Sequence, residues 1–101
     1  MKPLPVKWSP ATKDEFAELL NYVEVYFGLD AALKLLDKTD KVLDSISEHP
    51  PLFPASTQSP SIRKAVITKQ TTLFYRIKST EIQLLHFWDN RRNPDTLEFL
   101  I

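Results

Sequence analysis

The sequence contains no cysteine and only one glycine among its 101 residues. Without cysteine the chain cannot form disulfides, thiolate nucleophiles, redox motifs or zinc fingers with cysteine ligands. Thirteen basic residues balance thirteen acidic ones, which excludes binding of nucleic acid through bulk positive charge, so direct nucleic-acid contact is not expected outside a target complex. No apolar run approaches the roughly 18 residues of a membrane span, and residues 1–5 lack the apolar core of a signal peptide. We therefore expect a cytoplasmic protein that does not contact a membrane.

The length and the distribution of charge indicate how the chain is organised. A chain of 101 residues predicts a single domain over residues 1–101, because single domains commonly contain about 100 to 150 residues. Residues 1–49 hold six lysines and nine acidic residues, a net charge of −3, whereas residues 50–101 hold seven basic and four acidic residues, a net charge of +3. The sequence thus joins an acidic half to a basic half.

Two amphipathic helices are predicted in the acidic half. Ser9 followed by Pro10 is typical of a helix start, and Thr12 with Glu15 offers a competing capping box. Gly28 stands where a residue in the left-handed conformation ends the first helix. Apolar residues and one threonine recur at helical spacing, namely Phe16, Leu19, Leu20, Val23 and Phe27 in the first helix, and Ala32, Leu35, Leu36, Thr39, Val42, Leu43 and Ile46 in the second.

The second helix is predicted to have Asp30 as its cap and to end by His49, because Pro50 and Pro51 disfavour a helix before them. A link of about two or three residues predicts that the two helices form an antiparallel αα-hairpin. Residues 50–61 contain four prolines, three serines and one threonine, and this composition predicts a loop.

Strand-forming residues dominate the basic half. Three strands are predicted at residues 62–68, 71–78 and 81–89, and the short gaps between them predict an antiparallel meander. The segment near Trp8 is predicted to add an edge strand, and residues 96–101 are a short apolar tail. The predicted fold class is α+β, with the N-terminal αα-hairpin packed on this small antiparallel sheet, because the helical stripes need a sheet face to cover them.

Four segments of the chain follow one another in a characteristic order: WSPA at residues 8–11, IRKAV at 62–66, LFYRI at 73–77 and IQLLHFWDNRRNP at 82–94. Over about residues 6–95 this order resembles the RelE/ParE toxin superfamily of bacterial type II toxin-antitoxin systems. The resemblance implies a small cytoplasmic toxin whose cognate antitoxin wraps a C-terminal segment over it. No cofactor is expected.

Members of this superfamily differ in their targets. The RelE-like branch cuts mRNA on the ribosome with basic residues that stabilise charge on the scissile phosphate, and the matching residues here are Arg63, Lys64, Arg91 and Arg92. Two departures count against cleavage, because Thr72 stands where RelE-like enzymes commonly carry arginine and the tail after residue 94 contains no tyrosine or histidine. The ParE-like branch, which inhibits DNA gyrase and has no known hydrolytic constellation of its own, resembles the sequence better.

The candidate residues for binding a partner come from the same strands, turn and tail. They are Arg76, Phe87, Trp88, Arg91, Arg92, Leu97 and Phe99. The basic members complement an acidic partner, and the apolar ones mark a partner site if the tail does not fold back onto the sheet. The alternative interpretation is that the basic residues are solvated and that the apolar ones are covered by a docked tail.

The remaining tyrosine and histidine candidates have structural interpretations. Tyr75 alternates with apolar residues along its strand, which predicts a core position and not a general acid. His86 is predicted to be a hydrogen-bonded core histidine. Since His49 is the only other histidine, no metal site is expected.

The leading functional hypothesis is a toxin of a plasmid-stabilisation system that inhibits growth by binding a target such as DNA gyrase. The first alternative is a ribosome-dependent mRNA endonuclease of RelE type that uses Arg63, Lys64 and Arg91 or Arg92 to stabilise charge. A further alternative is a non-toxic relic or regulatory binding module, because a family resemblance fixes fold better than function. Only the first alternative, the mRNA endonuclease, would make this protein an enzyme.

Overall fold

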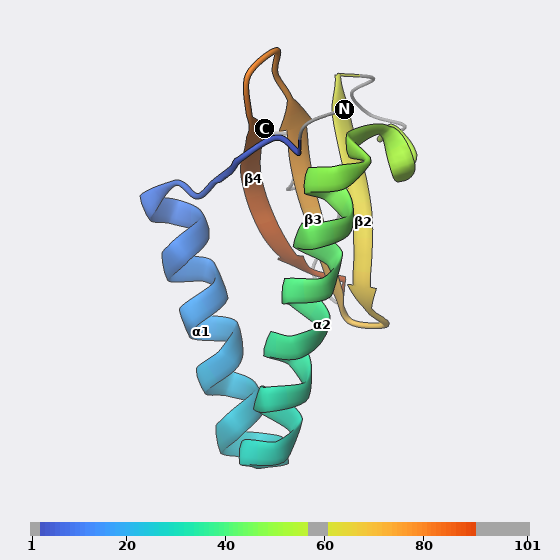
Figure 1. Cartoon of the computed structure of the whole chain (residues 1–101). Helices are drawn as coiled ribbons and strands as arrows, with labels where there is room; N and C mark the ends of the chain where they lie inside the picture. Colours follow the sequence, from blue (N-terminus) through green and yellow to red (C-terminus); the bar gives the residue numbers. More distant parts are fainter. Residues whose placement is uncertain (1–2, 57–60, 91–101) are drawn as a thin grey trace.

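Two helices cover one face of a four-stranded sheet in the computed structural model, which describes residues 3–56 and 61–90 (Figure 1). In chain order the elements are β1 (Val6–Lys7), α1 (Pro10–Phe27), α2 (Leu29–Glu48), the 3-10 helix η1 (Pro50–Leu52), β2 (Ile62–Thr68), β3 (Thr71–Ile77) and β4 (Ile82–Asp89). The predicted α+β class, with a helical hairpin packed on a small sheet, is confirmed.

Helix α1 begins where Ser9 and Pro10 predict. The Ser9 hydroxyl accepts a hydrogen bond from the Thr12 amide at 3.1 Å, and the Thr12 hydroxyl oxygen accepts one from the Ser9 amide at 2.8 Å. These reciprocal bonds satisfy two amides that a helix start otherwise leaves without partners. The competing start at Thr12 is not used, because Thr12 is the third residue of the helix and is fully buried.

Gly28 makes the turn of the hairpin by itself. Its φ of 96° is left-handed, its amide donates to the Glu24 carbonyl oxygen at 3.0 Å, and α2 starts at the next residue. The predicted cap at Asp30 and the predicted link of two or three residues are therefore wrong. One left-handed residue already reverses the chain, which places Asp30 inside the first turn of α2.

The order of strands in the sheet is β1-β4-β3-β2. The last three strands in the chain form the predicted antiparallel meander, and β1 pairs in parallel with β4, with Val6 opposite Ile82 and Lys7 opposite Gln83. The predicted edge strand near Trp8 is thus confirmed. The first strand of the chain lies beside the last.

The main core lies between the hairpin and the sheet. Its buried members are Phe16, Leu35, Ile46, Ala65, Ile67, Leu73, Tyr75, Ile82, Leu84 and Phe87. At one end of this core the rings of Trp8, Phe16 and Phe87 have centroids 4.9 to 5.6 Å apart, the range in which aromatic pairs attract one another. These contacts fix the start of α1 against the sheet.

The start of the predicted loop is held against the sheet. The Tyr75 hydroxyl donates to the Pro50 carbonyl oxygen at 2.8 Å, and Arg63 Nη1 donates to the Phe53 carbonyl oxygen at 2.6 Å. Both bonds satisfy backbone carbonyls that follow the end of α2. Residues 57–60 lie outside the described residues.

The hairpin extends beyond the sheet that it covers. Figure 1 shows the connected ends of α1 and α2 projecting past the turn between β2 and β3. Phe27 is 66% exposed and Leu36 is 38% exposed. The prediction that both side chains are buried in the core is wrong. Phe27 is the last residue of α1 and stands beside the connection at Gly28, and Leu36 follows the buried Leu35, so a rotation of about 100° along the helix turns its side chain away from the face that holds Leu35. We call residues 22–33, around the connection at Gly28, the hairpin tip.

Candidate binding groove at the hairpin tip

The two predicted basic residues of β2 lie on different faces of the sheet. Arg63 Nη1 lies 2.6 Å from the Phe53 carbonyl oxygen and 3.4 Å from that of Pro51, so its guanidinium holds the segment after α2. Lys64 is exposed and lies on the opposite face, because successive strand residues alternate. The structure therefore does not bring Arg63 and Lys64 into one cluster.

Arg76 shares the outer face of the sheet with Lys64. It stands between Ile62 of β2 and Gln83 of β4 in the strand register, and it is half-buried. Two cations on one face can contact an anion, so the predicted partner-binding role of Arg76 stays a prediction. The other predicted residues of the turn and tail, Arg91, Arg92, Leu97 and Phe99, lie outside the described residues.

Phe87 and Trp88 are both buried. Phe87 is 6% exposed and belongs to the main core, whereas Trp88 is 4% exposed and packs with Ile62 and Phe74 on the outer face of the sheet. Side chains covered to this extent offer little surface to a partner. Their predicted contact with a partner stays a prediction, and the groove described below does not include them.

A contact that the sequence did not reveal joins α1 to β4. One Glu15 carboxylate oxygen accepts a hydrogen bond from the Phe87 amide at 3.2 Å, and the other lies 2.9 Å from His86 Nδ1. His86 is half-buried, so the predicted hydrogen-bonded histidine is found at the margin of the core. Glu15 is 71 residues away from its partner His86, and no local pattern spans that separation.

Tyr75 is buried in the core, as predicted. Burial raises the pKa of its phenol above the ordinary value, while Arg63 and a backbone hydrogen bond involving Phe53 oppose this shift. A neutral hydroxyl that donates to the Pro50 carbonyl has a structural role. Within residues 3–56 and 61–90, no group of three His, Asp or Glu side chains could hold a metal ion.

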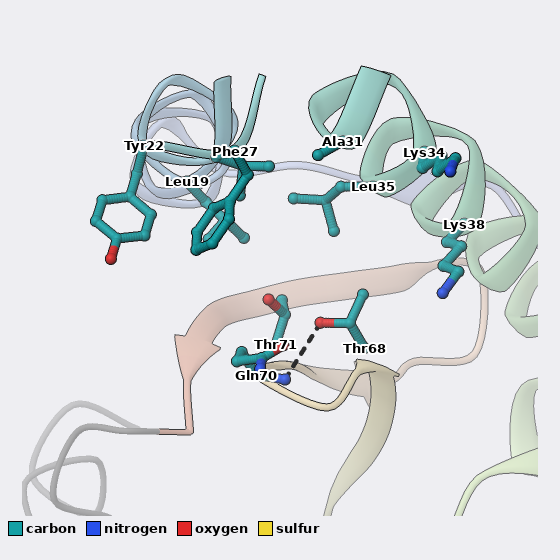
Figure 2. A pocket seen from close by; sticks show the side chains of 11 residues that line it. Leu19, Tyr22, Phe27, Ala31, Lys34, Leu35, Lys38, Thr68, Gln70 and Thr71 are labelled. Carbon is teal, nitrogen blue, oxygen red and sulfur yellow. Dashed lines mark hydrogen bonds between the residues drawn. The ribbon is translucent and has the colours of Figure 1, made fainter. Parts of the chain in front are cut away.

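An open groove of about 390 Å³ lies between the hairpin and the turn that joins β2 to β3 (Figure 2). We call it the hairpin groove. Leu19, Tyr22, Val23 and Phe27 of α1, Ala31, Lys34, Leu35 and Lys38 of α2, and Thr68, Gln70 and Thr71 of the strand turn line it. Figure 2 shows the Phe27 ring directed toward Thr71, the Tyr22 ring at the side of the groove, and Leu35 between the two helices. The volume lies in the range of ligand pockets, about 300 to 1,000 Å³.

The charge around the hairpin groove is positive. Its charged lining residues are Lys34 and Lys38, both exposed and both on α2. Residues four apart on a helix lie on one face, about 6 Å apart along its axis. No acidic side chain lines the groove in the part of the chain that the structure describes. A partner with an apolar surface and negative charge on the α2 side would complement it.

The hairpin tip around the groove exposes more apolar surface. Val25, Tyr26, Phe27, Leu29 and Leu33 are each more than half exposed. The Tyr22 and Tyr26 rings have centroids 4.7 Å apart, and those of Tyr22 and Phe27 are 6.4 Å apart. Single exposed apolar side chains are common, whereas a cluster of them is a candidate surface for binding a partner.

A signal for this surface was present in the sequence. Val25, Tyr26, Leu29 and Leu33 lie outside the two predicted apolar stripes and within five residues of the only glycine. Large apolar residues on the solvent side of an amphipathic helix need another surface to cover them. The prediction missed the site because it followed the stripes alone.

Within residues 3–56 and 61–90, no helix is both long and apolar enough to cross a membrane.

The fold is that of the RelE/ParE toxin superfamily. The structure of a chromosomal ParDE toxin-antitoxin system from P. aeruginosa matches with a TM-score of 0.73 at 16% identity, over 88% of this chain and 98% of that one. A YoeB dimer from Staphylococcus aureus matches with a TM-score of 0.61 at 15% identity, over 85% of this chain and 95% of that one. A YoeB-YefM complex from the same organism gives 0.55 at 18% identity, over 84% and 94%.

The sequence identifies the family within this superfamily. Residues 6–94 match the sequence model of the ParE toxin of type II toxin-antitoxin systems, parDE. The chain therefore belongs to the ParE toxin family. Among curated proteins, none matches it.

Proposed function

We propose that this ParE-family toxin inhibits growth by binding its target, DNA gyrase, and that a cognate antitoxin keeps it inactive. The observation that carries the proposal is the apolar hairpin groove with the exposed side chains around it. Exposed apolar patches of this kind bind proteins. The matched ParDE structure is of a toxin-antitoxin system, and the matched YoeB-YefM structure is of a complex. The first of these supports an antitoxin as one partner.

Cleavage of RNA is the second candidate. Stabilising charge on a scissile phosphate requires several cations directed at one point. Arg63 is occupied by backbone carbonyls, so among the described residues this candidate rests on Lys64 and Arg76, which share the outer face of the sheet. The similarity to YoeB supports the fold alone.

The test is pulse labelling of DNA and protein synthesis in bacterial cells after tightly controlled induction of the chain without its antitoxin. We expect incorporation of thymidine to stop before incorporation of methionine. The next experiment is then a supercoiling assay with purified gyrase. Co-expression of the protein encoded beside the gene for this chain is expected to restore growth.

Lys64→Ala separates the two candidates, because it removes an exposed cation of the outer face and leaves the hairpin untouched. A DNA-synthesis arrest that persists in Lys64→Ala supports binding. An early arrest of translation that Lys64→Ala relieves contradicts gyrase binding and supports cleavage. If folded chain accumulates without either arrest, the proposal of a toxin is wrong.

A further inference from the structure

We propose that the outer side of α2 binds a second copy of the chain, in a two-fold antiparallel contact centred between Leu33 and Leu36. This inference goes beyond the proposed function and does not depend on it. The surface is separate from the hairpin groove, because neither leucine lines that groove. Two features carry the inference, an apolar row along the helix and a row of charges beside it.

The apolar row lies on the outer side of α2. Leu29, Leu33 and Leu36 are 58%, 52% and 38% exposed. At about 100° per residue, the three side chains lie within about 60° of one another, and Leu33 lies about 160° around the helix from the buried Leu35. Spacings of four and three residues are typical of a helix that packs along another helix. We call these three leucines the outer ladder.

A charged residue ends the outer ladder. Asp40 is exposed and occupies the next position, four residues after Leu36. Burying an unpaired carboxylate in an apolar contact is costly, so Asp40 confines the apolar contact to the first half of α2. In an antiparallel pair, Leu33 of one copy lies opposite Leu36 of the other, and Asp40 lies at the edge of the contact, where water reaches it.

The charges beside the outer ladder determine the direction of the pairing. Four exposed residues alternate in sign at spacings of four, three and four, namely Asp30, Lys34, Asp37 and Lys41. Read from the other end, the spacings are the same and every sign is opposite. An antiparallel pair therefore places each carboxylate across from an ammonium group, whereas a parallel pair places like charges together.

The two patterns place the two-fold axis at nearly the same point. The outer ladder together with Asp40 is symmetric about the midpoint between residues 34 and 35, and the charges are symmetric about the midpoint between residues 35 and 36. These midpoints are one residue apart, about 1.5 Å along the helix. A two-fold contact must be complementary to itself, and this double symmetry favours a second copy over an unrelated partner.

The ion pair within α2 leaves the proposed contact possible. Asp37 lies 2.9 Å from Lys41, and their side chains remain 64% and 75% exposed. A carboxylate has two acceptor oxygens and an ammonium group has three donors. Each can therefore keep its partner in the same helix and bind a second one across the contact.

Sedimentation equilibrium of the full-length chain tests the apolar row. We expect a dimer whose association Leu33→Ala weakens by about tenfold or more, because each copy loses a central apolar side chain. Leu52→Ala is the matched control, since Leu52 is 59% exposed but lies in η1. The control should change the association by less than about threefold.

Lys34→Glu tests the charges, because it places two carboxylates opposite each other in the antiparallel pair. It should weaken the association by about tenfold, and more strongly at low salt than at high salt. Combining Lys34→Glu with Asp37→Lys restores opposite signs and should recover most of the association. Lys78→Glu, at an exposed position between β3 and β4, controls for the change in total charge and should have less than about a threefold effect.

Introduced cysteines measure the direction of the pairing, because the chain has none of its own. Leu36→Cys places the two thiols near the two-fold axis, so air oxidation should link the two copies. Leu29→Cys places them about 18 Å apart along an antiparallel pair, which is beyond the reach of a disulfide. We therefore expect a covalent dimer from the first variant and not from the second.

A chain that stays monomeric at about 100 μM would overturn the inference and leave the toxin function intact. Equal disulfide formation by the two cysteine variants would contradict the antiparallel pairing. A dimer that Leu33→Ala and Lys34→Glu leave unchanged would place the contact elsewhere. If the wild type is a monomer and Leu33→Ala weakens binding to gyrase or to the antitoxin, the outer side of α2 belongs to that partner instead.

Discussion

The two ends of the helical hairpin carry the same apolar pattern in different surroundings. Phe16 and Phe27 are eleven residues apart on one stripe of α1, yet Phe16 is 8% exposed and Phe27 is 66% exposed. At the first end the stripe meets Trp8 and Phe87 from the sheet side. At the second end Phe27 faces the turn between β2 and β3 across the open hairpin groove (Figure 2). The difference teaches that one apolar stripe can be buried in the core over part of its length and remain available to a partner over the rest.

The covered end of the hairpin is also fastened by polar contacts. The Leu4 amide donates to the Ser47 carbonyl oxygen at 3.0 Å, and the Ser47 hydroxyl donates to the Leu4 carbonyl oxygen at 2.6 Å. Glu15 adds its bond to the Phe87 amide. We therefore expect substitutions at the covered end to change stability and substitutions at the tip to change binding.

The largest expected effect is that of Phe16→Ala. Removing a buried aromatic ring that contacts two others should lower the free energy of unfolding by about 3 to 5 kcal/mol. Urea unfolding followed by circular dichroism measures this loss. A change below about 1 kcal/mol would show that the covered end is not the stable part of the hairpin.

Tyr75→Phe tests the next contact along the covered end. It leaves the buried Pro50 carbonyl without its donor, which should cost about 1 to 3 kcal/mol. Since burial raises the pKa of Tyr75 above 10.0, its neutral form stabilises the fold fully below that pH, and the contribution is lost as pH rises through the folded-state pKa. Urea unfolding at neutral and strongly alkaline pH should show this loss in the wild type and not in Tyr75→Phe.

Ser9→Ala should have a smaller effect, about 1 kcal/mol, because the α1 start loses the hydroxyl that accepts from Thr12. Thermal unfolding at fixed pH measures it. Ser45→Ala is the control, since the Ser45 hydroxyl donates to the Lys41 carbonyl within an exposed part of α2. Equal effects of the two substitutions would contradict a specific contribution of the cap.

Phe27→Ala should have the smallest effect on stability. Its side chain is mostly exposed, so the free energy of unfolding should change by no more than about 0.5 kcal/mol. The same urea unfolding used for Phe16→Ala makes the two phenylalanines directly comparable. A loss as large as that of Phe16→Ala would mean that the tip belongs to the core and would remove the basis of the groove.

Local signals in the sequence predicted most of the fold. Ser9 and Gly28 marked the ends of α1 correctly, and the strands predicted at residues 71–78 and 81–89 are found at Thr71–Ile77 and Ile82–Asp89. These features depend on residues close together in the chain, such as a cap or a left-handed turn. The structure confirmed the predicted fold class, and the match to the ParE toxin model confirmed the predicted family.

The site was harder to predict, because it depends on where separate elements end. The spacing of apolar residues in α1 predicts which face of the helix carries Phe27. It does not predict how far the sheet extends opposite that face. Arg63 and Lys64 were grouped because they are adjacent in sequence, although strand alternation places neighbours on opposite faces. To predict the contact of Glu15 with His86 and Phe87, one must know that α1 packs against β4. No local sequence pattern encodes that packing.

The parallel pairing of β1 with β4 has a consequence for synthesis of the chain. The strand at residues 6–7 can pair only after its partner β4, at residues 82–89, has been synthesised. Phe16 of the hairpin is likewise covered only once β4 is present. At about 5 to 20 residues per second, the 41 residues from 49 to 89 take the ribosome about 2 to 8 s to add. During that interval the nascent chain exposes the whole hairpin stripe. The described part of the toxin therefore completes its fold only after β4 has been made.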